Sequence, residues 1–363
     1  MKTKIDLRKL AGMTSSDRAF LSLYLSGSDS LEKMKKRIHN IRKLLKGKPD
    51  EHKHFEENLK MIENYFQKNP RSSGSICIFA CWLLDYIEII PLNVPVEDLI
   101  WIDSSPFILP LAEIQDEYEN FVVVVADNDR ARIYIVASGR AESEEKIKGN
   151  VKNHVKVGGW SQQRYERRRD NQMHHYAHEI VTKLEDMEKK EDFRRIVLVG
   201  SRETINEIHK AMPKHLLEKV IGEKALDLRK DDMFINKEIF NLFFADERKS
   251  EIDLWKKIKA HYMRGQLAVV GMEEVIKLAN MGRVEKVIAN RNIKFKGVRC
   301  RECEGLFPGT HHKCPGCGSD SVFEVDPLNE LIEILASTSA EADLADEIPE
   351  LSEVGGIAAL LRY

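Results

Sequence analysis

The chain has 363 residues, with 57 Lys and Arg against 59 Asp and Glu, so its formal net charge is −2. This balance argues against a uniformly basic nucleic-acid binder and leaves room for a basic patch that is offset elsewhere. At about 150 residues per domain the length predicts two or three domains. No apolar run reaches the roughly 18 residues that span a bilayer, and no signal-peptide core follows Met1, so we expect a cytoplasmic protein.

The first part of the chain, residues 1–118, is predicted to form an α/β domain. Phe20 to Leu25 has the pattern of a strand, and the charged segment after it has a helical pattern that is broken at Gly47 to Glu51. This indicates a strand followed by a helical hairpin. A second apolar run contains Cys77 and Cys81, which we interpret as buried core thiols.

The middle part, residues 119–246, is predicted to be a second α/β domain. Two apolar runs, 121–126 and 131–136, flank a polar turn and indicate a hairpin. After a polar stretch without apolar periodicity, residues 161–189 have a helical pattern. Apolar side chains recur along it at three- and four-residue spacing, which predicts one packed face. They are Met173, Tyr176, Ile180, Leu184 and Met187. A strand at 196–200, followed by a helix, completes the layered pattern.

The last part, residues 247–363, is predicted to be a third α/β domain that begins at a charged joint, Glu247 to Ser250. Its end is acidic, because eight Asp and Glu and no Lys or Arg lie between Glu330 and Leu361. The simplest interpretation is a solvated face. A docking surface for a basic partner is the alternative.

Four cysteines in this third part predict a metal site. Two Cys-x-x-Cys pairs stand ten residues apart, a spacing typical of a zinc ribbon, here over residues 298–320. A closed site of four thiolates would hold a structural Zn²⁺. Its ligands would be Cys300, Cys303, Cys314 and Cys317, with His311 or His312 as alternative ligands.

Two histidines in the middle part, His174 and His178, are four residues apart and could bind a metal on one helix face. No third ligand is evident at a suitable spacing. Polar-face residues near RNA, or satisfied surface groups, are therefore the favoured interpretation.

The segment 146–169 carries eight basic residues and one acidic residue, a net charge of +7. Crowded like charges of this kind favour contact with a polyanion such as RNA, whereas the simpler interpretation is a flexible, solvated loop before a surface helix. Within the segment, Gly158 and Gly159 would allow backbone N–H groups to approach a substrate closely. The residues predicted to contact RNA are Lys152, Lys156, Arg164, Arg167, Arg168 and Arg169.

Residues 158–167, Gly-Gly-Trp-Ser-Gln-Gln-Arg-Tyr-Glu-Arg, resemble the Gly-Gly-Gln loop of the archaeal and eukaryotic class-one peptide-chain release factors. Trp160 stands where that family has its catalytic glutamine. Gly159 to Gln162 is similar to the Gly-x-x-Gln motif of the Vms-like branch, whose members hydrolyse peptidyl-tRNA on stalled ribosomes. The C-terminal residues 355–363 are also similar to the ending of archaeal release factors.

This resemblance implies an α/β (α+β), three-domain release-factor architecture with a small zinc ribbon inserted in the C-terminal domain. It also implies a catalytic loop in which Gln162 or Gln163 positions a water molecule against the peptidyl-tRNA ester, with no cofactor for catalysis. The loop residues that would form this site are Gly158, Gly159, Trp160, Ser161 and Gln162.

The implied partners are the ribosome and peptidyl-tRNA, together with a translational GTPase or ribosome-splitting ATPase that the C-terminal domain would contact. Stop-codon readers of the family carry an Asn-Ile-Lys-Ser motif at the tip of the helical hairpin, where this chain has residues 46–51, Lys-Gly-Lys-Pro-Asp-Glu. We therefore expect a peptidyl-tRNA hydrolase that acts in ribosome rescue without reading a codon. A noncatalytic Pelota-like rescue factor and a divergent, codon-dependent release factor are the alternatives. Cleavage of the ester and cleavage of the tRNA 3′ end both stay open.

Overall fold

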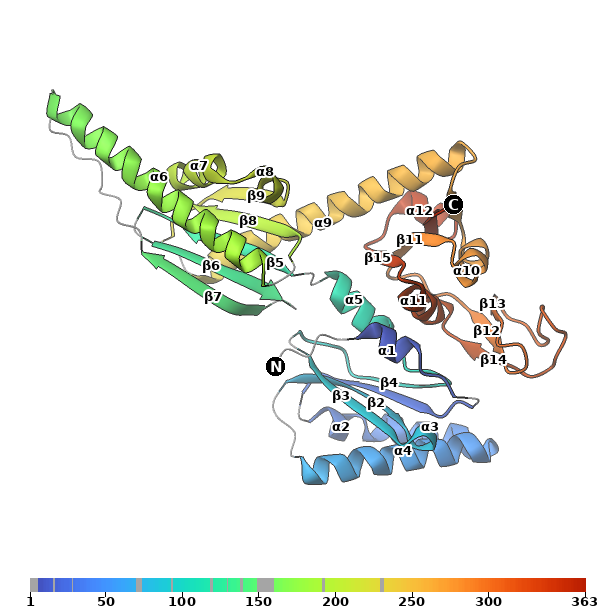
Figure 1. The fold of residues 1–363 in the computed structure, drawn as a ribbon. Coiled ribbons are helices and arrows are strands. Elements are labelled where there is room, and N and C mark those ends of the chain that lie inside the picture. Colours follow the sequence, from blue (N-terminus) through green and yellow to red (C-terminus); the bar gives the residue numbers. More distant parts are fainter. Residues whose placement is uncertain are drawn as a thin grey trace. The chain divides into compact units, whose positions relative to one another are not determined.

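A computed structural model gives the fold of the chain (Figure 1). It describes residues 6–15, 17–27, 29–69, 74–92, 94–117, 120–128, 130–137, 140–148, 160–190, 193–228 and 232–363. Within the terminal residues of some elements only the backbone is described, and these include residues 160–162.

The N-terminal part is an antiparallel sheet in the order β3-β2-β1-β4. Its strands are β1 (Phe20–Leu25), β2 (Ser75–Cys81), β3 (Tyr86–Leu92) and β4 (Leu99–Asp103). The helical elements of this part are α1 (Leu7–Ala11), α2 (Ser30–Lys33), α3 (Lys35–Leu44), η1 (Leu45–Gly47), α4 (Pro49–Lys68), η2 (Trp82–Leu84) and α5 (Leu109–Glu117). The predicted first strand and the predicted helical hairpin are confirmed.

Alternate residues of this sheet form a core with the long helix α4. Leu21 and Leu23 of β1 and Ile78 of β2 point to the side on which Phe55 and Leu59 of α4 are buried. Pro49 begins α4, where its missing N–H costs nothing, and Asp50 lies in the first turn, where the helix dipole favours a negative charge.

The middle unit is a five-stranded mixed sheet in the order β7-β6-β5-β8-β9. The strands are β5 (Phe121–Ala126), β6 (Arg130–Ala137), β7 (Arg140–Lys148), β8 (Arg195–Gly200) and β9 (Val220–Ala225), with helices α6 (Trp160–Glu188), α7 (Arg202–Ala211) and α8 (Lys214–Leu217). The β5–β6 hairpin is confirmed, and β5, β8 and β9 run parallel to one another.

Both faces of the central strands are buried, which explains why β5 and β8 are almost continuously apolar. Val122 and Val124 face the core formed with α6 and α7. Val123 and Val125 face Ile235, Ile239 and Phe243 of helix α9 (Asp232–Met263) on the other side of the sheet.

Strand β7 lies in the stretch that was predicted to be polar and without periodicity. It pairs with β6 at the edge of the sheet and has the sequence Arg-Ala-Glu-Ser-Glu-Glu-Lys-Ile-Lys. Edge strands of natural proteins are often charged, which discourages pairing with another chain. The charged residues that made this strand difficult to recognise in the sequence are therefore typical of an edge strand.

The C-terminal part has a second mixed sheet in the order β10-β16-β11-β15. Its strands are β10 (Ala268–Val270), β11 (Val284–Asn290), β15 (Glu341–Ala345) and β16 (Ile357–Leu361), and its helices are α10 (Met272–Asn280), α11 (Pro327–Thr338) and α12 (Pro349–Glu353). Trp255 and Ile258 of α9 pack on one face of this sheet with Leu351 of α12.

The charged joint predicted at Glu247 to Ser250 lies inside α9, and the division of the chain into two compact units falls directly after it, between Ser250 and Glu251. Glu, Arg and Lys are good helix formers, so charge alone did not mark an end. Arg195 also holds this stretch by ion pairs with Asp246 and Glu247.

A small three-stranded sheet, in the order β13-β12-β14, is inserted between β11 and α11. Its strands are β12 (Gly297–Cys300), β13 (Leu306–Pro308) and β14 (Val322–Val325). The four cysteines of the predicted ribbon lie at the end of β12 and in the turns that follow. The α/β class with a small insert in the C-terminal region is therefore confirmed.

The chain divides into two compact units, Met1–Glu117 with Glu251–Tyr363, and Tyr118–Ser250. The division into three domains stays a prediction. Among the described residues, no helix combines the length and the apolar character that crossing a membrane requires.

Candidate catalytic loop, basic helix and metal centre

Helix α6 follows the predicted catalytic loop and is fixed to the sheet by its apolar face. Met173, Ile180 and Leu184 are buried against strands β5, β6 and β8, with Tyr176 and Met187 in the same core. All five positions predicted from the periodicity are therefore confirmed as the packed face. Figure 1 shows the N-terminal end of α6 reaching past the edge of the sheet.

The exposed face of that N-terminal end is basic. Arg164, Arg167 and Arg168 are all exposed and recur at three- and four-residue spacing, which places them along one side of the helix. Within the described part of the chain, no carboxylate lies within ion-pair distance of the three guanidinium groups. Their donors are therefore open to an external anion such as a phosphate.

Arg169 differs from its neighbours because it is buried. Its guanidinium forms a two-pronged ion pair with the carboxylate of Glu203 on α7, and this partner raises the pKa of Arg169. The side chain thus holds α6 against α7, which is a different role from the phosphate contact predicted for it.

The start of α7 is positioned by the end of strand β5. Gly200 has φ +147°, and a Cβ there would lie 1.7 Å from the carbonyl oxygen of Ala126, so only glycine fits. The Ser201 hydroxyl caps the helix by accepting from the Thr204 amide at 3.1 Å, and the Thr204 hydroxyl donates to Asn128 at 3.0 Å. These contacts fix the first turn of α7 and therefore the position of Glu203.

Part of the predicted catalytic loop and two of the predicted RNA contacts lie outside the described residues. This holds for Lys152, Lys156, Gly158 and Gly159. Trp160, Ser161 and Gln162 form the first residues of α6, where only the backbone is described, and Gln163 is exposed. The catalytic assignments therefore stay predictions.

The four cysteines of the ribbon come together as one cluster whose sulfur atoms all lie within 4.8 Å of one another. The Sγ atoms of Cys300 and Cys317 are 3.6 Å apart, and those of Cys303 and Cys314 are 3.5 Å apart. Zn–S bonds of about 2.3 Å in a tetrahedron place sulfur atoms about 3.8 Å apart, so the cluster fits Zn²⁺.

The turns around the cluster are built for close packing. A Cβ on Gly305 or Gly316 would lie 2.7 or 2.8 Å from the ring of Phe307, so a side chain at either position would displace that ring. The amide of Cys317 donates to the sulfur of Cys314 at 3.4 Å. His311 directs Nε2 to the Pro308 carbonyl oxygen at 2.8 Å, away from a ligand role.

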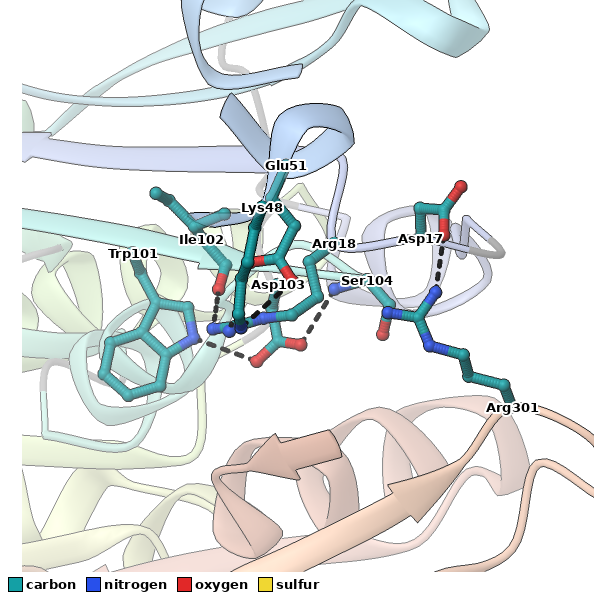
Figure 2. A network of polar contacts seen from close by, with 9 residues as sticks. All are labelled: Asp17, Arg18, Lys48, Glu51, Trp101, Ile102, Asp103, Ser104 and Arg301. Carbon is teal, nitrogen blue, oxygen red and sulfur yellow. Dashed lines mark hydrogen bonds and ion pairs between the residues drawn. The ribbon is translucent and has the colours of Figure 1, made fainter. Parts of the chain in front are cut away.

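A polar network connects the ribbon with the N-terminal sheet inside the first unit (Figure 2). Arg301, which stands between the first two cysteines, pairs with Asp17 at 2.5 Å. The neighbouring Arg18 donates to the Ile102 carbonyl at 2.7 Å and lies 3.7 Å from Glu51. Trp101 donates to Asp103 at 3.2 Å.

Two members of the acidic stretch are buried, so the solvated-face interpretation is wrong for them. Glu330 is 3% exposed and pairs with Arg299 at 2.5 Å. Glu333 accepts from the Ser105 hydroxyl at 2.7 Å and from Asn329 at 2.9 Å. Burial raises the pKa of Glu330 to about 7 and raises the pKa of Glu333 well above its usual range. No local pattern in the sequence signals this cluster, because its partners come from distant segments.

The remaining candidate residues are the two thiols of β2 and the histidine pair of α6. Cys77 and Cys81 are fully buried in β2, as predicted for core thiols, and burial raises the pKa of both. His174 and His178 are exposed on α6 with their Nε2 atoms 3.1 Å apart.

A family model described as bacterial archaeo-eukaryotic release factor family 10 matches residues 106–234. Peptide chain release factor subunit 1 of Methanopyrus kandleri is 30% identical over 230 residues, which cover 60% of this chain and 54% of the relative. The same factor of Methanocaldococcus jannaschii is 26% identical over 299 residues, covering 72% of this chain and 70% of the relative. The chain is therefore similar in sequence to archaeal release factors, and it spans about half the length of the first of these relatives.

Among solved structures, an archaeal translation termination factor aligns over 98% of this chain and 96% of its own, with 14% identity and a TM-score of 0.27. Archaeoglobus fulgidus Pelota aligns over 77% of this chain and 75% of its own, with 16% identity and a TM-score of 0.35.

Proposed function

We propose that this protein is a release-factor-like peptidyl-tRNA hydrolase that acts on stalled ribosomes without recognising a stop codon. The observation that carries the proposal is the row of exposed guanidinium groups, Arg164, Arg167 and Arg168, at the start of α6 immediately after the Gly-Gly-Trp-Ser-Gln-Gln sequence. Sequence relatives named peptide chain release factor subunit 1 support the same class of function.

In this proposal the three arginines bind phosphates of the tRNA acceptor stem, and Arg169 fixes the helix that carries them. Phosphate contacts of this kind set position, while the loop performs the chemistry. Gly158 and Gly159 allow the backbone to approach the ester, and Gln162 orients the attacking water and stabilises the developing oxyanion. The metal centre is structural and takes no part in this reaction.

The absence of codon recognition is proposed from the hairpin tip between α3 and α4. There the chain has exposed lysines, Lys46 and Lys48, and then Pro49 as the first residue of α4. The C-terminal sheet and the ribbon form the part that would contact a translational GTPase or a ribosome-splitting ATPase.

One sequence feature favours a second candidate function. Trp160 stands at the position where release factors have glutamine, and this favours a noncatalytic rescue factor that binds stalled ribosomes and recruits a partner. Such a factor would bind ribosomes with the same basic helix and would release no peptide.

The experiment that tests the catalytic assignment is release of labelled peptide from stalled ribosome complexes by the wild type, Gln162→Ala and Gln163→Ala. We expect the rate to fall by about 100-fold in Gln162→Ala, the loss typical of one oxyanion-stabilising donor, and to change little in Gln163→Ala. The reverse pattern would assign the role to Gln163, and no release by the wild type would favour the noncatalytic factor. Analysis of the tRNA on a gel distinguishes ester hydrolysis from cleavage of the tRNA 3′ end.

A further inference from the structure

The exposed face of α6 carries two histidine rings whose geometry suits a shared ligand. His174 and His178 are one helical turn apart, their ring centroids are separated by 4.4 Å, and the ring planes stand at 84° to each other. Their Nε2 atoms approach to 3.1 Å. Nε2 is the nitrogen atom at the outer end of each ring, and both side chains are exposed, so an ion from solvent can reach the two atoms.

This separation matches that of two nitrogen ligands on one metal ion. Imidazole nitrogen binds Zn²⁺ at about 2.0–2.1 Å, so two such ligands lie about 2.8–3.0 Å apart in adjacent octahedral positions and about 3.3–3.4 Å apart in tetrahedral positions. Both side chains start from one helix, and residues four apart are neighbours on its surface. Binding would therefore need little rearrangement of the backbone.

We propose that His174 and His178 form a second metal site, which binds one late first-row divalent ion, such as Zn²⁺, Ni²⁺ or Cu²⁺, through their Nε2 atoms. Imidazole is a ligand that suits these ions. In the described part of the chain the cysteine cluster is the one group of three or more candidate ligands, so this pair forms an open site whose other positions are filled by water. It differs in this way from the closed, structural thiolate site.

The same 3.1 Å approach also allows a hydrogen bond in which one ring N–H donates to the other ring. A metal ion would take the place of that proton, and both rings would then carry their proton on Nδ1. Thr182 is the next residue along this face, and its hydroxyl donates to the backbone carbonyl of His178 at 2.9 Å. This hydrogen bond does not involve the imidazole ring of His178. The proposal does not depend on the hydrolase function.

The test uses the full-length protein with zinc in the cysteine site and without a polyhistidine tag. Ni²⁺ is titrated by calorimetry into the wild type and into His174→Ala, His178→Ala and His175→Ala. His175 is a matched control, because its ring is also exposed on α6 and its centroid lies 6.5 Å from that of His174. All three substituted residues are exposed, so the fold should persist, and circular dichroism checks it.

We expect the wild type and His175→Ala to bind one additional Ni²⁺ per chain, and His174→Ala and His178→Ala to bind it at least about tenfold more weakly. Zinc content is measured in parallel, so that exchange into the cysteine site is not counted. Electron paramagnetic resonance of bound Cu²⁺ should show coupling to two nitrogen atoms in the wild type and to one in either single variant. No additional ion in the wild type, or equal affinity in all four proteins, would overturn the proposal.

Discussion

Three side chains at the start of α6 carry the first prediction at the scale of single residues. Replacing Arg164, Arg167 and Arg168 together by alanine should weaken binding to an acceptor-stem RNA, because each guanidinium is exposed and can hold a phosphate. The slope of log affinity against log salt should fall by about 1 for each arginine lost. Lys214→Ala is the control, since Lys214 is an exposed base of the same unit, on α8. An unchanged salt slope in the triple variant would remove these residues from the RNA contact.

The metal ligands give a second residue-scale prediction. Cys317→Ser should lose zinc, because it removes one of the four sulfur atoms of the cluster, whereas His311→Ala should retain zinc, because its Nε2 contacts the Pro308 carbonyl. Metal analysis of the purified proteins checks both. Zinc loss in His311→Ala would show that the histidine is a ligand.

Single residues also mark the limit of what the sequence could predict. The cysteine cluster and the apolar positions of α6 follow from local spacing, which a sequence shows directly. The burial of Glu330 and Glu333 depends on Arg299 and Ser105, which come from other segments of the chain. Arg169 has the same charge as its exposed neighbours, but it lies four residues before Met173 and so on the packed face of α6, where it pairs with Glu203.

At the scale of elements, the pairing of α6 with α7 is expected to depend on one ion pair. Glu203→Arg should destabilise the middle unit by about 2–3 kcal/mol, because it leaves the buried guanidinium of Arg169 beside a like charge. Arg169→Glu combined with Glu203→Arg should recover part of this loss. Urea unfolding of the wild type, Glu203→Arg and the double variant measures this loss of stability, and equal stability of the single and double variants would show that the pair does not couple the helices.

Elements with a clear pattern of apolar residues could be predicted from the sequence. Elements whose residues reflect their position in the fold could not. The β5–β6 hairpin and the strand β8 are apolar runs between turns, and the structure confirms them. Strand β7 is charged because it is an edge strand, so its sequence lacks the alternation of a half-buried strand. Helix α9 runs through Glu247 to Ser250. The sequence could not show this, because the same charged residues suit a helix and a linker equally well.

For the first unit as a whole, the buried carboxyl cluster predicts a dependence of stability on pH. Burial raises the pKa of Glu330 from 4.5 to about 7, so between these values the folded state binds more protons than the unfolded state. The contribution of Glu330 to the free energy of unfolding should therefore be greatest below about pH 4.5. It should fall by up to about 3 kcal/mol as the pH rises through 7. Asp103 and Asp326, whose pKa values burial also raises, act in the same direction.

Urea unfolding followed by tryptophan fluorescence at pH 5 and pH 8 measures this dependence. Glu330→Gln is the matched variant, because it keeps the shape of the side chain and removes its titration. The difference in unfolding free energy between the two pH values should be smaller in Glu330→Gln than in the wild type. An equal difference in both proteins would assign the pH dependence to other groups.

For the whole molecule, the central claim is hydrolysis of peptidyl-tRNA on the ribosome without a codon signal. The most direct measurement compares the rate of labelled peptide release by the wild-type protein from two stalled complexes, one with an empty decoding site and one with a stop codon there. Our account predicts release from both complexes at similar rates and its loss in Gln162→Ala. Release from the stop-codon complex alone, or from neither complex, would contradict it.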